Sequence, residues 1–277
     1  MIIVKLGGSL ITDKGRPFAA RYEIIARLAD EVRRALEVAP ALKLLLGHGS
    51  GSFGHWAAAP YGTRQGVQTA AQWRGYAEVA AAAARLNRIV TDAFLDAGVP
   101  VLSLQPSASA HCHDGVLEHL DVQPIQAALR HGLVPLVYGD VAFDDVRGGT
   151  IISTEDIFVF LTYAFNERGD MFRPTRILLL GEVDGVLDAE GNVIPCISPD
   201  EQPALNAVLG RAQGVDVTGG MIDKVTRMFE LVERYPEIRV HILNGTYPGL
   251  LTRALLDESL EAGTRIVAAS RAIERDE

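Results

Sequence analysis

Short apolar runs separated by longer amphipathic stretches make up most of this chain. Six runs predict β-strands: Ile2–Leu6, Leu42–Leu46, Val99–Leu104, Leu133–Val137, Ile177–Leu180 and Val240–Leu243. Most of them are continuously apolar, which is typical of parallel strands buried on both faces. The stretches between them predict helices, for example Arg21–Val38, Gln65–Asp96 and Met221–Arg234. This alternation predicts an α/β fold, an open, mostly parallel twisted sheet with helices on both faces.

One stretch breaks the alternation. Val141–Ser153 has Arg147-Gly148-Gly149 in its middle, which predicts a β-hairpin inserted after a strand. With 277 residues the chain is long for one domain and short for two. We therefore expect a single domain, 1–277, built as two lobes.

Five turns that follow predicted strands combine glycine with a polar or charged residue. These turns are Lys5–Ser9, Gly47–His55, Tyr138–Asp140, Gly181–Gly185 and Asn244–Thr246. One glycine after a strand is ordinary turn chemistry. The carboxyl ends of parallel strands, however, meet at one edge of a sheet, where the ligands of open α/β folds bind. Five such turns therefore predict an active site at that edge.

The charge of the chain restricts its expected partners, and its cysteines and apolar runs indicate its cellular compartment. A net charge of −9 argues against a nucleic-acid or anionic-membrane partner, so an anionic substrate must be attracted by a few lysines, backbone amides and a cation. The two cysteines, Cys112 and Cys196, have neither metal-type spacing nor a disulfide framework. The opening MIIVKLGG is too short for a signal-peptide core, and no apolar run could span a bilayer. We expect a cytoplasmic protein.

Two common nucleotide-binding motifs do not account for this chain. It has no GxxxxGK[ST] sequence, which excludes a P-loop enzyme. Gly49–Gly54 fits GxGxxG, but a histidine follows it and a second, lysine-bearing glycine turn lies upstream. A dinucleotide site is therefore disfavoured.

Two lysines near the start of the chain are candidates for binding phosphate. Lys5 lies in the first predicted strand, just before Gly7–Ser9, whose amides could hold an anion. The alternative is an edge-strand lysine whose amine reaches solvent. Lys14 lies in a polar loop, where a lysine is usually solvated, but only one short turn separates it from Lys5.

His55 is the most informative of the seven histidines. It ends a glycine turn, and imidazole can donate a hydrogen bond to phosphate in either protonation state near neutral pH. The alternative is a packing or capping role at the Ala-rich helix that follows. His111, His113 and His119 lack a supporting cysteine or carboxylate pattern, so we interpret them as surface residues and predict no metal held by the protein itself.

The segment Asp216–Lys224 predicts a glycine turn that opens a helix, with Lys224 close to the helix start. A helix N-terminus combined with a lysine is suited to nucleotide phosphates. An ordinary capped helix start is the alternative.

These motifs together resemble the amino acid kinase superfamily, whose fold is an αβα sandwich. KLGGS, the glycine turn after the second strand, GD, VDGV and DVTGGMxxK follow in order, so the resemblance covers nearly the whole chain. Acetylglutamate and carbamate kinases end the second turn in Pro-Gln, whereas Ser-Phe-Gly-His is similar to isopentenyl phosphate kinases and to the related fosfomycin kinases. KLGGSLITDK and Ser103–Ser107 favour the first of these two groups.

Two features depart from the pattern of these relatives. Ser50 and Ser52 stand where many relatives have glycine or alanine. Thr154-Glu155-Asp156 replaces a glycine-containing Ser-Gly-Asp-Asp.

The resemblance implies phosphorylation of isopentenyl phosphate by ATP, a step of isoprenoid biosynthesis in the alternative mevalonate route. It implies Mg²⁺ held mainly by nucleotide phosphates and water, and we expect a homodimer. A fosfomycin or other small-anion kinase is one alternative. A non-catalytic nucleotide-binding protein is another, because fold does not fix function.

The resemblance also implies roles for individual residues. The expected catalytic residues are Lys5, Lys14, His55 and Asp140, with the lysines stabilising the transferring phosphoryl group and Asp140 orienting both lysines. The expected acceptor-binding residues are Ser50, Gly51, Gly54, His55 and Thr154. The expected ATP-binding residues are Lys5, Gly7, Gly8, Ser9, Gly51, Glu182, Asp184, Gly185, Gly220 and Lys224. The acceptor would occupy a lobe of approximately residues 1–170, and ATP a lobe of residues 171–277.

The hydrocarbon tail of such an acceptor needs an apolar wall. Trp73, Tyr76, Ala80 and Ala84 recur at steps of three and four residues, which places them on one helical face. A role in the core or at a dimer seam is an equally open interpretation of this face.

Overall fold

The fold combines a large sheet with a small second one. The computed structural model describes residues 1–167, 169, 171–209 and 220–269. In this part of the chain the main sheet has the strand order β10-β12-β11-β9-β1-β2-β6-β3, and the second sheet has the order β5-β4-β7-β8.

All six predicted strands are present in the main sheet. They are β1 (Ile2–Leu6), β2 (Leu44–His48), β3 (Val101–Ser103), β6 (Val134–Tyr138), β9 (Arg176–Gly181) and β11 (Arg239–Asn244). Neighbours among these six pair in parallel, and only the short β12 (Thr264–Ile266) runs antiparallel to β11, with β10 (Cys196–Ile197) beside it. The predicted fold class is confirmed. The predicted bounds of β2 were two residues early, so Gly47 and His48 belong to the strand and not to the turn.

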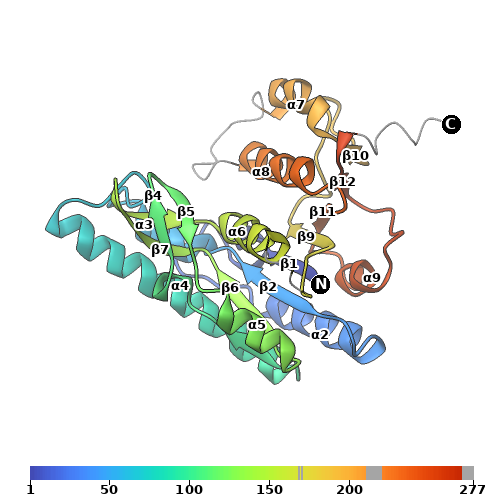
Figure 1. Ribbon diagram of the computed structural model, residues 1–277, viewed down its shortest axis with the longest axis horizontal. Helices are drawn as coiled ribbons and strands as arrows, with labels where there is room; N and C mark the ends of the chain where they lie inside the picture. Colours follow the sequence, from blue (N-terminus) through green and yellow to red (C-terminus); the bar gives the residue numbers. More distant parts are fainter. Residues whose placement is uncertain (168, 170, 210–219, 270–277) are drawn as a thin grey trace.

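Helices cover both faces of the main sheet (Figure 1). They are α1 (Gly8–Ile11), α2 (Tyr22–Val38), α3 (Gly51–Ala58), α4 (Ala70–Asp96), α5 (Gln123–Arg130), α6 (Thr154–Glu167), α7 (Gln202–Leu209), α8 (Gly220–Arg234) and α9 (Leu250–Leu256). The predicted start of α4 at Gln65 was too early. The helix begins after Thr69, whose side chain and that of Gln72 form a capping box.

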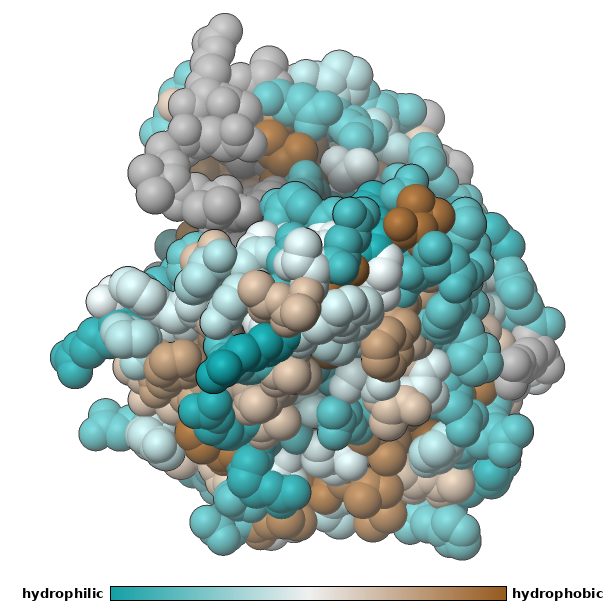
Figure 2. Space-filling model, turned by 90° about the vertical axis from the view of Figure 1, so that its left-hand side faces the viewer, coloured by the Kyte–Doolittle hydropathy of each residue, from teal (hydrophilic) through white to brown (hydrophobic). Residues whose placement is uncertain are grey.

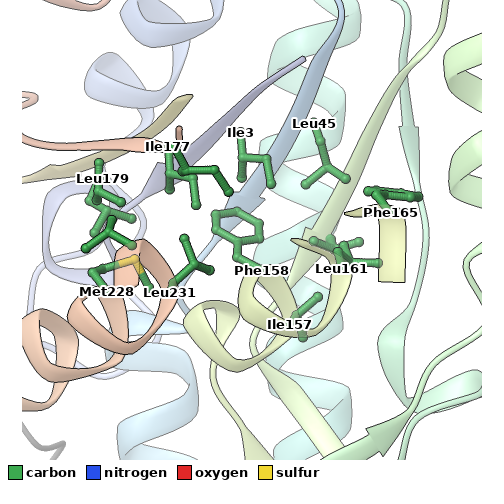
Figure 3. Close-up of a cluster of buried hydrophobic side chains, with 14 of the residues drawn as sticks. Ile3, Leu45, Ile157, Phe158, Leu161, Phe165, Ile177, Leu179, Met228 and Leu231 are labelled. Atoms are coloured by element: carbon green, nitrogen blue, oxygen red, sulfur yellow. The ribbon is translucent and has the colours of Figure 1, made fainter. Parts of the chain in front are cut away.

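Successive side chains of each strand point to opposite faces of the main sheet, so the core has two layers. Ile3, Ile177 and Leu179 point toward α6 and α8, where Phe158 and Met228 meet them (Figure 3). Val4, Leu46 and Leu178 point the other way and pack against α2, α4 and α9. Because both faces of these strands are buried, most of their residues are apolar, which is the pattern seen in the sequence.

The predicted β-hairpin is confirmed. It consists of β7 (Asp140–Asp144) paired antiparallel with β8 (Gly148–Ile152). Strand β7 also pairs with β4 (His111–His113), which pairs with β5 (Val116–His119), and these four strands form the second sheet. The sequence did not predict β4 and β5, because they are too polar to give a strand pattern. His113 and His119 are exposed and His111 is half-buried, as expected for surface residues. No helix in the described part of the chain is both long and apolar enough to cross a membrane.

Candidate active site

The five glycine turns lie at one edge of the main sheet, as predicted. They follow β11, β9, β1, β2 and β6, which are consecutive parallel neighbours. Backbone hydrogen bonds link each turn to the next: Gly245 N–H to Gly181 O (2.8 Å), Gly7 N–H to Leu180 O (2.8 Å), Gly49 N–H to Leu6 O (3.0 Å) and Gly139 N–H to His48 O (3.1 Å). Residues far apart in the sequence therefore form one continuous rim.

The turns after β1 and β2 contact each other because both have glycine at the point of closest approach. A Cβ on Gly8 would lie 2.6 Å from Gly51 N, and a Cβ on Gly51 would lie 2.1 Å from Thr12 Oγ1. Gly51 also has a φ of +49°, in the left-handed region that favours glycine. The N-termini of α1 and α3 are thereby brought side by side, with their amide groups at the same edge.

The second turn is shorter than the sequence predicted, because α3 already begins at Gly51. Within it, Ser52 N–H donates to Thr12 Oγ1 at 2.9 Å, and the Phe53 and Gly54 N–H groups donate to Ser50 O at 3.1 Å each. Among the residues that the structure describes, the N–H groups of Ser50 and Gly51 donate no hydrogen bond to the protein. These two amides are the ones suited to an anion.

Two of the predicted acceptor-binding residues, Gly54 and Thr154, have contacts that support the turn and the start of α6. A Cβ on Gly54 would lie 2.1 Å from Ser50 Oγ, so this glycine makes room for the Ser50 side chain. Thr154 is 1% exposed, and its hydroxyl donates to His48 O at 2.7 Å. It holds the start of α6 to β2.

His55 and Lys14 both have exposed side chains near the rim. His55 lies in α3, whose first residue is Gly51, so it is one helical turn from the two available amides. Lys14 lies in the loop between Thr12 and Ala20, which a β-bridge closes. This loop contacts α3 through the Ala19 N–H, which donates to Ser52 Oγ at 3.3 Å.

Lys5 forms a buried ion pair with Glu155. Lys5 shares the strand face of Ile3, which α6 covers, and Glu155 is the second residue of α6. The Lys5 Nζ donates to Glu155 Oε1, and each residue is 8% exposed. A buried lysine needs such a partner, because an unpaired buried charge is costly.

A second lysine acts on the same carboxylate. Burial favours a higher pKa for Glu155, but the charges of Lys5 and Lys224 outweigh burial and lower the pKa to about 2. Lys224 is on α8, and Arg227, three residues later, forms an ion pair with Asp156 at the start of α6. The α6 carboxylates therefore connect the β1 lysine with the helix that carries Lys224.

Gly47 allows this arrangement, because it lies beside Lys5 on β2 and has no side chain. A Cβ at this position would lie 2.6 Å from Phe158 Cζ and 2.7 Å from Thr154 Cγ2. The N-terminal end of α6 can therefore approach the sheet closely enough for Glu155 to meet Lys5.

The substitution Gly47→Ala should both destabilise the protein and slow its reaction. Overpacking of a filled core costs about 1–3 kcal/mol of unfolding free energy, and the displaced α6 would separate Glu155 from Lys5. Thermal melting and kcat measure the two effects. Gly181→Ala is the matched control, since a Cβ there would lie 4.0 Å from its nearest neighbour. An unchanged melting temperature for Gly47→Ala would contradict the tight approach of α6.

Asp140 has different partners from those expected. Its carboxylate accepts hydrogen bonds from the Ser107 N–H at 3.1 Å and from the Val141 N–H at 2.9 Å. Burial raises the pKa of Asp140, and the hydrogen bonds counteract this only in part. The carboxylate that contacts Lys5 is Glu155, so Asp140 does not orient that lysine in this structure.

The carboxylates expected beside the nucleotide follow β9. Glu182 forms an ion pair with Arg21, and Asp184 accepts a hydrogen bond from Asn244 Nδ2 at 2.8 Å. Hydrogen bonds from Asn244 and then Tyr247 lower the pKa of Asp184. Asp184 therefore ties the turn after β9 to the turn after β11.

The other three residues expected at the nucleotide, Gly185, Gly220 and Lys224, lie in the turn after β9 and in the first turns of α8. A Cβ on Gly185 would lie 2.5 Å from Thr264 Oγ1, so this turn lies against β12. Gly220 is the first residue of α8, and Lys224 follows it in the same helix. The predicted turn before it, Asp216–Gly219, lies outside the described residues.

An apolar cluster lies beyond His55, between α4 and the hairpin. Its buried members are Val67, Tyr76, Val79 and Val141, and Ala57, Ala58 and Ala80 pack against it. The rings of Trp73 and Tyr76 are 5.4 Å apart, and Phe143 lies 5.9 Å from the first and 5.5 Å from the second. At this end of the molecule hydrophobic residues form several surface patches among hydrophilic ones (Figure 2).

The predicted stripe on α4 is only partly exposed. Tyr76 is buried, Trp73 is 36% exposed, and Ala80 and Ala84 are half-buried. Within the described residues the Tyr76 hydroxyl is buried without a hydrogen-bond partner. The cluster therefore has both a core side and an open side.

Sequence interpretation missed two residues of this site, Glu155 and His48. Glu155 was noted only as a departure from a motif, although a carboxylate at a helix start next to a motif position was a usable signal. His48 was absorbed into the glycine turn. It is fully buried and stacks on Tyr138 with ring centroids 5.5 Å apart. The described residues contain no group of three or more His, Cys, Asp or Glu side chains that could hold a metal ion.

Comparisons with known proteins agree on one family. The amino acid kinase family model matches residues 1–244. The isopentenyl phosphate kinase of Methanothermobacter thermautotrophicus is 34% identical over 281 residues, covering 96% of this chain and 98% of that protein. The enzyme of the same name from Methanocaldococcus jannaschii is 31% identical over 267 residues, covering 93% and 96%.

Solved structures give the same result. An X-ray structure of isopentenyl phosphate kinase superposes with a TM-score of 0.78 at 32% identity, covering 96% of this chain and 100% of that chain. The product complex of the Thermoplasma acidophilum isopentenyl phosphate kinase has a TM-score of 0.73 at 26% identity, covering 96% and 99%.

Proposed function

This chain belongs to the amino acid kinase family, and from that premise we propose that it transfers the γ-phosphoryl group of ATP to isopentenyl phosphate. The products are ADP and isopentenyl diphosphate. The observation that carries this function is the rim of glycine turns with Lys5, Lys14 and His55 around it, in a chain similar over nearly its whole length to isopentenyl phosphate kinases.

The chemistry of the acceptor explains why no general base is needed. A phosphate monoester has a second pKa of about 6, so it is mostly a dianion at neutral pH and already a nucleophile. The barrier comes from repulsion between two anions and from charge on the transferring group. Positioning and electrostatic stabilisation are therefore the main tasks of the protein.

The acceptor side is formed by residues 1–170. The Ser50 and Gly51 N–H groups and the His55 imidazole hold the acceptor phosphate. Lys5, held in place by its ion pair with Glu155, and Lys14 stabilise the transferring phosphoryl group. Support for this assignment comes from the two available amides at the start of α3 and from the exposed positions of His55 and Lys14.

The nucleotide side is formed by residues 171–277 together with the first turn. Gly7, Gly8 and Ser9 border the phosphates, Lys224 contacts them, and Asp184 and Gly185 lie beside the rest of the nucleotide. Mg²⁺ bound mainly by the nucleotide phosphates and by water would neutralise part of the phosphate charge. We further propose that the protein is cytoplasmic and forms a homodimer. Size-exclusion chromatography with light scattering would test the dimer.

One experiment tests the function directly. ADP release should be measured in a coupled assay with isopentenyl phosphate, dimethylallyl phosphate, fosfomycin, N-acetylglutamate, aspartate and UMP as acceptors. Isopentenyl phosphate should give the highest kcat/KM. A preference for fosfomycin would contradict the proposed acceptor, and ATP binding without turnover of any acceptor would contradict catalysis.

The substitution Lys14→Ala should lower kcat about a hundredfold, because charge stabilisation during phosphoryl transfer is typically worth several kcal/mol. ATP affinity should change little. Steady-state kinetics and titration calorimetry measure the two quantities. Arg16→Ala is the matched control, because Arg16 is exposed in the same loop. If Lys14→Ala keeps most of the parent kcat, Lys14 is a solvated loop residue.

The cluster beside His55 should set the length of the acceptor tail. Trp73→Ala or Tyr76→Ala should improve the turnover of longer prenyl phosphates relative to isopentenyl phosphate. Large side chains exclude longer tails sterically, and each buried methylene contributes about 0.8 kcal/mol. The measurement is the ratio of kcat/KM for geranyl phosphate to that for isopentenyl phosphate.

Leu95→Ala serves as the control for this prediction, since Leu95 is exposed at the other end of α4. It should leave the ratio unchanged. Loss of stability with an unchanged preference in both aromatic variants would assign the cluster to the core.

A further inference from the structure

A chain of hydrogen bonds ends on the backbone of the second glycine turn. The Ser103 hydroxyl of β3 contacts Asn87 Oδ1 of α4. The Asn87 Nδ2 lies 3.2 Å from His48 Nε2, and His48 Nδ1 lies 3.0 Å from the Gly49 carbonyl oxygen. His48 and Asn87 are buried, so water does not compete for these contacts.

The chemistry of the groups fixes the direction of every bond in this chain. The Gly49 oxygen can only accept, so His48 Nδ1 carries the proton that faces it. Burial, and then the charge of Lys5, lower the pKa of His48 to about 4, so the ring is neutral near pH 7. Its Nε2 then has a lone pair and accepts from the Asn87 amide, while Asn87 Oδ1 accepts from the Ser103 hydroxyl. A single tautomer satisfies all three contacts.

The last bond determines where the next amide points. In a trans peptide the carbonyl and the N–H point in opposite directions, and the described chain has no cis peptide bonds. His48 draws the Gly49 oxygen toward the interior. The Ser50 N–H, which belongs to the same peptide, is therefore directed away from His48. Among the described residues, the Ser50 N–H donates no hydrogen bond to the protein.

We propose that His48 is a positioning residue for the acceptor phosphate: its hydrogen bond to the Gly49 carbonyl fixes the Gly49–Ser50 peptide so that the Ser50 N–H is presented to the anion. The identity of that anion rests on the proposed function. Ser103 and Asn87 fix the tautomer and the orientation of the ring. His48 does not itself contact the substrate.

Two substitutions of His48 distinguish a packing role from the proposed hydrogen-bonding role, because the two roles predict opposite rankings of the variants. His48 stacks on Tyr138, and glutamine is closer to histidine in size than asparagine is, so a packing role favours His48→Gln over His48→Asn. The hydrogen bond requires the opposite order. The asparagine amide nitrogen is one bond from Cγ, as Nδ1 is in histidine, whereas that of glutamine lies one bond farther out and falls near Nε2.

The test measures KM for isopentenyl phosphate and KM for ATP in both variants, with melting temperatures. His48→Gln should raise the acceptor KM about tenfold, and His48→Asn no more than about threefold, as expected for loss or retention of one hydrogen bond. The ATP KM should stay within about twofold of the parent in both. Equal shifts, or glutamine closer to the parent than asparagine, would overturn the proposal.

Two additions make the outcome decisive. If neither His48 variant folds, Asn87→Ala keeps the histidine but releases its tautomer, and should raise the acceptor KM about threefold at unchanged ATP KM. No change in Asn87→Ala would also overturn the proposal. Calorimetric Kd values for inorganic phosphate, measured with a non-hydrolysable ATP analogue bound, should follow the same order. They test His48 even if the parent enzyme does not phosphorylate isopentenyl phosphate, a result that would refute only the proposed function.

Discussion

The substitution Glu155→Gln is expected to lower kcat about a hundredfold to a thousandfold, with a smaller effect on the KM for either substrate. Glutamine keeps the size of the side chain but cannot balance the charge of the buried Lys5. Preorganised charge at the transferring group is worth several kcal/mol in the transition state, so a displaced Lys5 appears mainly in kcat. Steady-state kinetics at saturating ATP measures the effect.

The same variant should also be less stable, with a defined dependence on pH. The pKa of Glu155 is lowered from the ordinary 4.5 to about 2 in the folded protein. The stabilisation by the ionised carboxylate is therefore complete above pH 4.5 and is lost as pH falls toward 2. The difference in melting temperature between parent and Glu155→Gln should be constant near neutral pH and shrink below about pH 4.5.

Asp156→Asn is the matched control. Asp156 is the neighbouring carboxylate on α6, and its ion pair is with Arg227 instead of Lys5. It should cost some stability and leave kcat within a few-fold of the parent. A Glu155→Gln enzyme with near-parent kcat would show that the ion pair with Lys5 serves folding alone.

The substitution His55→Ala should nearly abolish phosphorylation of the acceptor while ATP binding stays intact. A charge-assisted hydrogen bond contributes about 1.5–3 kcal/mol, and loss of alignment of the attacking oxygen adds to it. The fall should therefore appear in kcat as well as in KM. The measurements are kcat/KM for isopentenyl phosphate and calorimetric ATP affinity. His113→Ala, at an exposed histidine of β4, is the control.

Two further observations separate a binding role of His55 from packing. His55→Gln keeps one N–H donor and should fall between the parent and His55→Ala. The acid limb of the pH profile should follow the second ionisation of the acceptor, about 6, because no base removes a proton from it. If kcat/KM of His55→Ala stays close to that of the parent, the histidine serves packing at the start of α3.

The strands and the site edge could be predicted from sequence because both follow from local patterns. A strand such as Ile177–Leu180, buried on both faces, must be continuously apolar, and parallel topology then brings the turns after such strands to one edge. His55 and Lys14 could be proposed from their neighbours in sequence.

The contact between Lys5 and Glu155 could not be predicted in this way. It depends on how closely α6 approaches β2 at Gly47, and this distance is a property of tertiary packing. The start of α3 at Gly51 could not be predicted either, because glycine and serine are weak helix formers and their local propensity favours a loop. Packing of α3 against α4 and the hydrogen bond that the Ser52 N–H donates to Thr12 Oγ1 override that propensity.

The central position of β1 has a consequence for how the protein is made. β1 pairs with β2 on one side and with β9 on the other, so its second partner is synthesised about 170 residues later. During synthesis one edge of β1 is an open template for pairing, a state that favours aggregation and chaperone binding. Pairing between such distant segments is also slow. In refolding experiments, catalytic activity should therefore return in the slowest phase, after most helical structure has formed.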